Sequence, residues 1–198
     1  MTRLRRGAVL LVLIAAAGCA ARKNEVVFVD PGPARLIEAK RLAEQAERAQ
    51  KAGRTDEAIE LYRQSLEQSQ DLFHVWNNLG MLLLQKDNYL DAAEAFHAAA
   101  NLAPKDPRPM YNVGVVYQRR AHDRQALDFF VKALERDPRY LPALRGAVAT
   151  GKSLMLTDEA ALLRVRTAVM LESDPQWRRL MEMEQFRLED AVRSRSGR

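Results

Sequence analysis

The sequence predicts an all-α protein in which pairs of helices stack into a solenoid, and two observations indicate this fold. The 198 residues are rich in Ala, Leu, Glu, Gln and Arg, and only 7% are aromatic, a composition that favours helices. Small and aromatic residues also recur at one constant interval along most of the chain, which is typical of repeat architectures. The length suits one short array of such units.

The repeat is carried by alanines, aromatic residues and glycines. An alanine recurs at Ala58, Ala92, Ala126 and Ala160, and we call this 34-residue interval the repeat period. Four residues after each of the first three alanines comes an aromatic residue: Tyr62, Phe96 and Phe130. Upstream of Ala92 lie Trp76, Leu79 and Gly80, and the next unit has Gly114 in the place of Gly80. Proline follows at Pro104 and Pro138.

This pattern resembles the tetratricopeptide repeat, whose units read Trp-x2-Leu-Gly-x2-Tyr, then Ala-x3-Phe, then Pro. The resemblance covers residues 36–175. It is close in Phe73–Asp106 and Pro107–Tyr140, supportive in Ala39–Leu72, and degenerate in the fourth unit. It implies a helix-turn-helix solenoid of about three clear repeats.

Each place in the pattern has a steric reason. We expect Gly80 and Gly114 to lie where the first helix of a unit crosses the second, because a side chain there would separate the two helices. Ala92 and Ala126 are the matching small residues on the second helix. Proline closes the unit because it lacks the amide donor that a continuing helix needs.

The fourth unit and the C-terminus depart from the pattern. Thr157-Asp158-Glu159-Ala160 repeats Thr55-Asp56-Glu57-Ala58 three periods later, which predicts a second helix in register with Ala160 at the crossing. Arg164 then stands in the place of the aromatic residue and Val148 in that of the glycine. From residue 176 we expect a capping helix, followed by a basic disordered tail that ends at residue 198. The apolar stripe of this helix is Trp177, Leu180, Met183/Glu184, Leu188 and Val192.

Residues 1–18 are typical of an export signal. Three arginines precede an apolar run from Ala8 to Ala17, and ten residues rise only about 15 Å as a helix, too short to span a bilayer. Ala16-Ala17-Gly18-Cys19 resembles the lipobox of bacterial lipoproteins, which implies acylation of Cys19. An ordinary signal peptide with an incidental cysteine is the alternative. We interpret residues 19–35 as the lipidated cysteine and a proline-containing tether.

The residue after Cys19 is Ala20 rather than Asp, which by the enterobacterial sorting rule implies the outer membrane, facing the periplasm. The net charge of +5 does not indicate a nucleic-acid partner, because residues 40–139 contain 15 basic and 15 acidic side chains.

The sequence contains no motif of an enzyme. The three histidines, His74, His97 and His122, do not form a metal-binding pattern, and no Gly-rich phosphate loop or Gly-x-Ser-x-Gly motif occurs. We therefore expect no catalytic residues, no metal, no cofactor and no small-molecule substrate.

The resemblance implies a groove lined by the first helices of the units, which holds a peptide or helix of a partner protein. The expected groove residues are Lys40, His74, Asn77, Asn78, Met81, Arg108, Tyr111, Asn112, Val115 and Arg119. Asn78 and Asn112 either bond a ligand backbone or are simply common at these places in the family. Lys40, Arg108 and Arg119 favour an acidic ligand, whereas Glu44 and Glu47 oppose one.

The leading hypothesis is a lipid-anchored interaction scaffold of the bacterial envelope. Its architecture is similar to the tetratricopeptide lipoproteins of type IV and Flp pilus assembly, which implies an envelope protein as partner. The alternative is an accessory factor of cell-wall metabolism that recruits a peptidoglycan hydrolase or binds glycan. A third class is a chaperone that holds unfolded clients.

Overall fold

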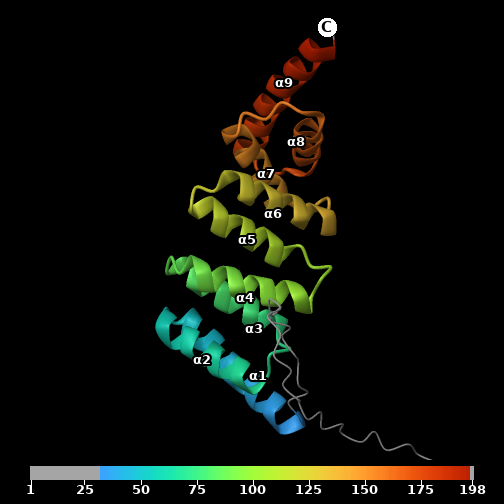
Figure 1. Ribbon diagram of the computed structural model, residues 1–198. Coiled ribbons are helices and arrows are strands. Elements are labelled where there is room, and N and C mark those ends of the chain that lie inside the picture. The colour runs from blue at the N-terminus through green and yellow to red at the C-terminus, as the bar shows by residue number, and fades with distance from the viewer. Residues whose placement is uncertain (1–31, 197–198) are drawn as a thin grey trace, which may run out of the picture.

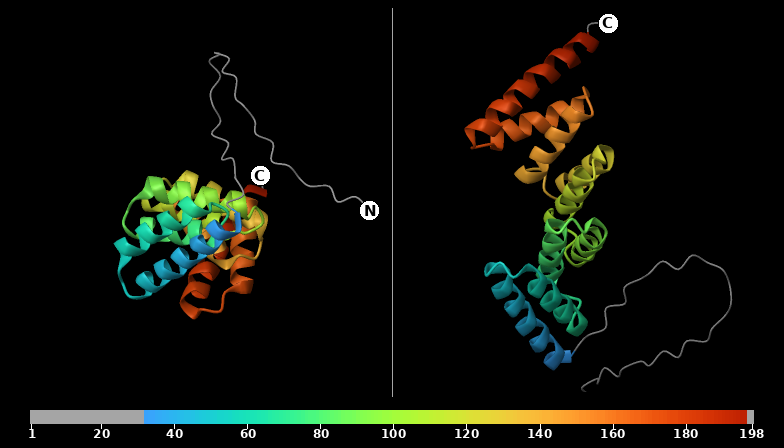
Figure 2. Two further views of the ribbon diagram at one scale, coloured as in Figure 1. Left: turned by 90° about the horizontal axis from the view of Figure 1, so that it is seen from below. Right: turned by 90° about the vertical axis from the view of Figure 1, so that its left-hand side faces the viewer.

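The computed structural model describes residues 32–196, and over this range every regular element is a helix, as the sequence predicts. The helices are α1 (Gly32–Lys51), α2 (Thr55–Gln68), α3 (Phe73–Gln85), α4 (Tyr89–Leu102), α5 (Arg108–Arg119), α6 (Asp123–Arg136), α7 (Leu141–Ser153), α8 (Glu159–Leu171) and α9 (Pro175–Ser196). They form four antiparallel pairs that stack one on the next, with α9 at the far end (Figure 1). Figure 2 shows the stack from one end (left) and from the side, where it is elongated (right).

The predicted signal peptide, Cys19 and most of the tether lie outside the described residues. Two expected boundaries shift. Helix α1 begins at Gly32, inside the segment expected to be tether, and Pro33 is tolerated in its first turn because a missing amide donor costs nothing there. Helix α9 continues to Ser196, so Arg193–Ser196 is helical rather than part of a disordered tail.

The same residue position forms the turn inside all four pairs. Gly53, Asp87, Ala121 and Met155 each have a positive φ, between 54° and 75°, and each stands one repeat period after the previous one. This left-handed residue ends the first helix and reverses the chain. The first helices of the units therefore keep the period throughout, including in the fourth unit.

In the second and third units, the first helix contacts the second through glycine and an aromatic ring. A Cβ atom added to Gly80 would lie 2.7 Å from Phe96 Cε1, and one added to Gly114 would lie 2.6 Å from Phe130 Cδ1. Both distances are shorter than van der Waals contact, so only glycine lets the helix backbone rest on the ring. Ala92 is fully buried beside this contact.

The buried side chains of the second helices follow the period in three units and then shift by one residue. The fully buried sets are Ala58/Tyr62/Ser65, Ala92/Phe96/Ala99 and Ala126/Phe130/Ala133, and the fourth is Ala161/Val165/Ala168, with Ala161 7% exposed. Ala160, expected at the crossing, is exposed.

The cause lies in the turn before α8. Five residues separate α7 from α8, whereas three separate the helices of each earlier pair, and Asp158 caps α8 by accepting a hydrogen bond from the Ala161 amide. Compared with the second helices of the earlier units, α8 is therefore rotated about its axis by about 100°, the angle between consecutive residues of a helix. Val165, not Arg164, stands in the place of the aromatic residue.

Helix α9 packs on α8 as a further first helix would, and its buried side chains differ from the expected stripe. Met181, Glu184 and Leu188 face α8, whereas Leu180 and Met183 are exposed. Arg187 pairs with Glu184 at 2.6 Å and donates to the Leu156 carbonyl at 3.0 Å, which ties α9 to the turn before α8.

Candidate partner-binding face

The first helices of the four units, α1, α3, α5 and α7, lie along one face of the solenoid, which we call the odd-helix face. Helix α3 packs directly against α5, and α5 against α7, so these helices are adjacent from unit to unit. A hollow of about 300 Å³ crosses this face between α1, α3 and α5. Its lining residues are Gln50, Met81, Leu82, Leu84, Gln85 and Arg119. Two of the expected groove residues, Met81 and Arg119, therefore share one concave site.

The chemistry of this hollow is mixed apolar and polar. Met81 is 44% exposed and offers a flexible, polarisable side chain, with Leu82 and Leu84 beside it. The amides of Gln50 and Gln85 and the guanidinium of Arg119 surround them. Such a site suits a peptide that buries one apolar side chain and offers backbone carbonyls or a carboxylate to the polar rim.

The expected asparagines connect neighbouring units by hydrogen bonds. Asn112 is 8% exposed and its amide donates to Asn77 Oδ1 at 3.0 Å, from α5 to α3. The amide of Asn78 donates to the Tyr62 hydroxyl at 3.3 Å, and that hydroxyl donates to Gln50 Oε1 at 3.1 Å. These amides each contribute at least one hydrogen bond to packing between helices.

Arg108, expected to help hold an acidic ligand, is bound by a neighbouring carboxylate. Its guanidinium lies 2.6 Å from Asp106 Oδ2 and stacks 5.1 Å from the centre of the Phe73 ring. The hydrogen bonds from Arg108 lower the pKa of Asp106 below its usual value. Among residues 32–196, Lys40 and Arg119 form no ion pair. Fewer of the three expected cations on this face are therefore free to bind an acidic ligand than the sequence indicates.

Three other expected residues, His74, Tyr111 and Val115, differ in their exposure. His74 is exposed, while Val115 and Tyr111 are half-buried. Tyr111 meets Tyr140 edge to face, with ring centres 5.7 Å apart, and burial raises the pKa of both hydroxyls. None of these three side chains lines the hollow that contains Met81.

A polar cluster that sequence reasoning missed fastens α7 to the C-terminal region. Arg145 makes two hydrogen bonds of 2.7 Å to Glu172, which is fully buried, and lies 5.1 Å from the centre of the Trp177 ring. The hydrogen bonds from Arg145 lower the pKa of Glu172 despite its burial. Arg145 stands one repeat period after Tyr111, so extending the groove positions into the fourth unit would have found it.

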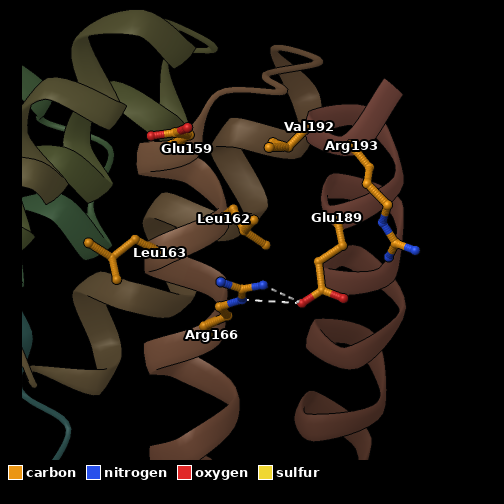
Figure 3. Close-up of a pocket in the computed structure, with 7 residues that line it drawn as sticks. All are labelled: Glu159, Leu162, Leu163, Arg166, Glu189, Val192 and Arg193. Atoms are coloured by element: carbon orange, nitrogen blue, oxygen red, sulfur yellow. Dashed lines mark hydrogen bonds and ion pairs between the residues drawn. The ribbon is translucent and has the colours of Figure 1, made fainter. Parts of the chain in front are cut away.

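Two further hollows lie away from the odd-helix hollow. One, of about 440 Å³, opens between α8 and α9, where Arg166 and Glu189 form a 2.8 Å ion pair across it (Figure 3). The other, of about 350 Å³, lies between α2, α3 and α4 over Trp76. Neither was predicted, because both depend on how helices from different units are arranged.

The histidine and acidic side chains of the described residues are dispersed rather than grouped. The three histidines lie on different elements, and within residues 32–196 no three His, Cys, Asp or Glu side chains are grouped to hold a metal ion. In the same range, no helix has an apolar stretch long enough to traverse a lipid bilayer.

Comparisons with known proteins agree with this architecture. The family model of the tetratricopeptide repeat matches residues 43–107 and 77–140. The general transcriptional corepressor ssn6 of Schizosaccharomyces pombe is 31% identical over 85 residues, which are 42% of this chain and 8% of that protein. Superkiller complex protein 3 of Homo sapiens is 25% identical over 113 residues, 57% of this chain and 7% of that protein. The chain thus spans less than a tenth of either relative.

Solved structures share the fold at low sequence identity. Pseudomonas aeruginosa PilF has a TM-score of 0.67 and 20% identity, covering 79% of this chain and 72% of that one. A MamA protein has a TM-score of 0.64 and 16% identity, covering 79% and 87%. The first such repeat domain of Spaghetti (RPAP3), bound to an HSP90 peptide, has a TM-score of 0.57 and 18% identity, covering 66% and 99%. At these identities the likeness concerns the fold alone.

Proposed function

We propose, from the premise that this chain is a tetratricopeptide repeat solenoid, that it is a non-enzymatic scaffold which binds a peptide or helix of a partner protein on its odd-helix face. The observation that carries this proposal is the hollow between α1, α3 and α5, where Met81 and Arg119 lie among glutamine amides. The structure of the Spaghetti (RPAP3) domain with an HSP90 peptide supports this use of the fold.

The ligand that fits this hollow is a short segment with one apolar side chain and an acidic neighbour. Met81 and Leu84 provide the apolar contact, and Arg119 provides the cation. Because Arg108 is bound by Asp106, the site carries fewer free positive charges than a clamp of three cations would. The partner is therefore recognised through one carboxylate rather than through an acidic run.

The proposed setting is the bacterial outer membrane, facing the periplasm, with the solenoid held by lipid on Cys19. The sequence around Cys19 and Ala20 supports this, together with the basic and apolar segments that precede them. The proposed partner is a component of pilus or secretion machinery, by similarity to the envelope lipoproteins that combine such an anchor with these repeats.

The alternative role in cell-wall metabolism has weaker support. Glycan binding is favoured by flat aromatic faces open to solvent. On the odd-helix face, Tyr111 and Tyr140 are half-buried and meet edge to face, which covers part of both rings.

Photo-crosslinking in a bacterium that produces the full chain tests the proposal. A photoreactive residue at position 81 should capture a discrete envelope protein, whereas the same residue at Met155, which is 82% exposed in the α7–α8 turn, should not. Arg119→Glu should weaken capture at least about tenfold, and Arg120→Glu, at the exposed neighbouring residue, should leave it unchanged. Equal capture from both positions would contradict the assigned face. Cys19→Ser should release the chain from washed membranes.

A further inference from the structure

The outward side of α9 carries apolar side chains that are exposed to solvent. Helix α8 covers the opposite side, burying Met181 and Leu188. On the outward side, Leu180 is 54% exposed, Met183 is 64% exposed and Phe186 is 74% exposed. Since α9 is the last element of the stack, this side lies at the end of the molecule (Figure 1). A polar side would be expected there if α9 served only to cap the array.

Charges of opposite sign flank the two most exposed of these side chains. Arg179 stands four residues before Met183, and Asp190 stands four residues after Phe186, so the four residues share one face of the helix. Their spacing of four, three and four residues is that of the contact positions in a pair of packed helices. Arg179 and Asp190 are exposed, and neither forms an ion pair with another residue of the range 32–196.

We propose that this side of α9 is a homodimer surface, on which two copies of the chain pair antiparallel about a two-fold axis passing between Glu184 and Gln185. This symmetry places Met183 opposite the partner's Phe186 and Arg179 opposite the partner's Asp190. Each contact occurs twice, as an isologous interface requires. The two apolar layers are then enclosed between two ion pairs.

The order of charged and apolar residues along this face favours a second copy of the chain as the partner. The face reads positive, apolar, apolar, negative along the helix, so it complements its own reverse. A parallel pairing would instead set Arg179 against the partner's Arg179 and Asp190 against the partner's Asp190, which is repulsive. Self-complementarity of this kind favours a second copy over an unrelated helix.

The pairing leaves the odd-helix hollow free. That hollow lies between α1, α3 and α5, at the other end of the stack from α9 (Figure 1). A dimer would therefore present two such hollows at its two ends, and a partner with repeated segments would gain avidity from both. The dimer itself does not depend on what the hollow binds.

Sedimentation of the full chain tests the proposal, using Cys19→Ser in mild detergent so that neither acylation nor a thiol contributes. The chain should sediment as a dimer of the 22.4 kDa polypeptide that dissociates on dilution. Phe186→Asp should weaken association at least about tenfold, and Leu90→Asp, at a side chain of α4 that is 68% exposed, should not change it.

Charge exchange distinguishes this pairing from other self-association. Arg179→Asp and Asp190→Arg should each weaken the dimer at least about tenfold, because each places like charges opposite one another. The double variant should restore association, because it only reverses the sign of both pairs. A chain that stays monomeric at every accessible concentration overturns the proposal, as does a dimer that Phe186→Asp leaves intact or that the double variant fails to restore.

Discussion

The central pairs, α3–α4 and α5–α6, and the C-terminal region, α7–α9, have the same helical plan and are held together differently. In the central pairs, a glycine backbone rests on a buried phenylalanine ring, and this contact recurs one repeat period later. In the C-terminal region, Val165 takes the place of the ring. There, the ion pair of Arg145 with Glu172 joins α7 to the segment that leads into α9.

The contrast shows that the registers of the first and second helices of a repeat are determined separately. The first helix and its left-handed turn residue keep the period as far as Met155. The second helix of the fourth unit then moves by one residue, because its starting point depends on the length of the turn and on the Asp158 cap. No contact between a glycine and an aromatic ring holds α7 and α8 in the register of the earlier pairs. The longer turn between these two helices is therefore tolerated.

The largest expected effect compares the two side chains at the centres of these regions. The Phe130 ring packs against Gly114 of α5 and also against Gly146 of α7. Phe130→Ala should therefore lower the free energy of unfolding by about 3–5 kcal/mol, because it leaves a large cavity between these two glycines. Val165→Ala, at the corresponding buried place, removes two methyl groups and should cost about 1.6 kcal/mol. Denaturant unfolding measures both values. Equal losses would show that the ring has no special role in the central pairs.

Removing the ion pair should affect the C-terminal region in a pH-dependent way. Arg145→Ala should cost about 1.5–3 kcal/mol at neutral pH, because it leaves the buried carboxylate of Glu172 without its partner. The pKa of Glu172 is lowered in the folded protein, so its contribution is complete above the unfolded value of about 4.3 and is lost as the pH falls through the folded value.

The difference in unfolding free energy between the parent chain and Arg145→Ala should therefore shrink at acidic pH. Thermal unfolding from pH 7 down to pH 3 measures this trend. A difference that stays constant across that range would indicate that Arg145 acts through packing on Trp177 alone.

The smallest expected effect tests the shift in register. Ala126 is fully buried where α5 and α6 approach closely, since a Cβ added to Gly114 would lie 3.2 Å from the Ala126 backbone oxygen. Ala126→Leu should therefore overpack this crossing and cost about 1–3 kcal/mol. Ala160→Leu should change stability by less than about 0.5 kcal/mol, because Ala160 is exposed. Comparable losses at the two positions, measured by urea unfolding, would mean that α8 keeps the register of the earlier units after all.

The repeat indicated which positions lie on the first helices of the units, but not the contacts that their side chains make. Positions such as Met81 and Arg119 follow from counting along the period, and they do share a hollow. The pairing of Arg108 with Asp106 depends on a turn between helices, and the hydrogen bond of Asn112 to Asn77 depends on how two units meet. A pattern of residue types within one unit holds no information about either contact.

The sequence by itself determined the helical pairs, their period and the small residues of the central crossings, because these depend on side-chain size at fixed helical spacing. Only the tertiary structure decided that the buried positions of α8 shift by one residue and that Glu172 is buried against Arg145. It also decided that Met183 and Phe186 of α9 remain exposed. These features depend on how each whole helix packs against its neighbour. The free energy of that packing is summed over many contacts between residues far apart in the chain, so no local pattern specifies it.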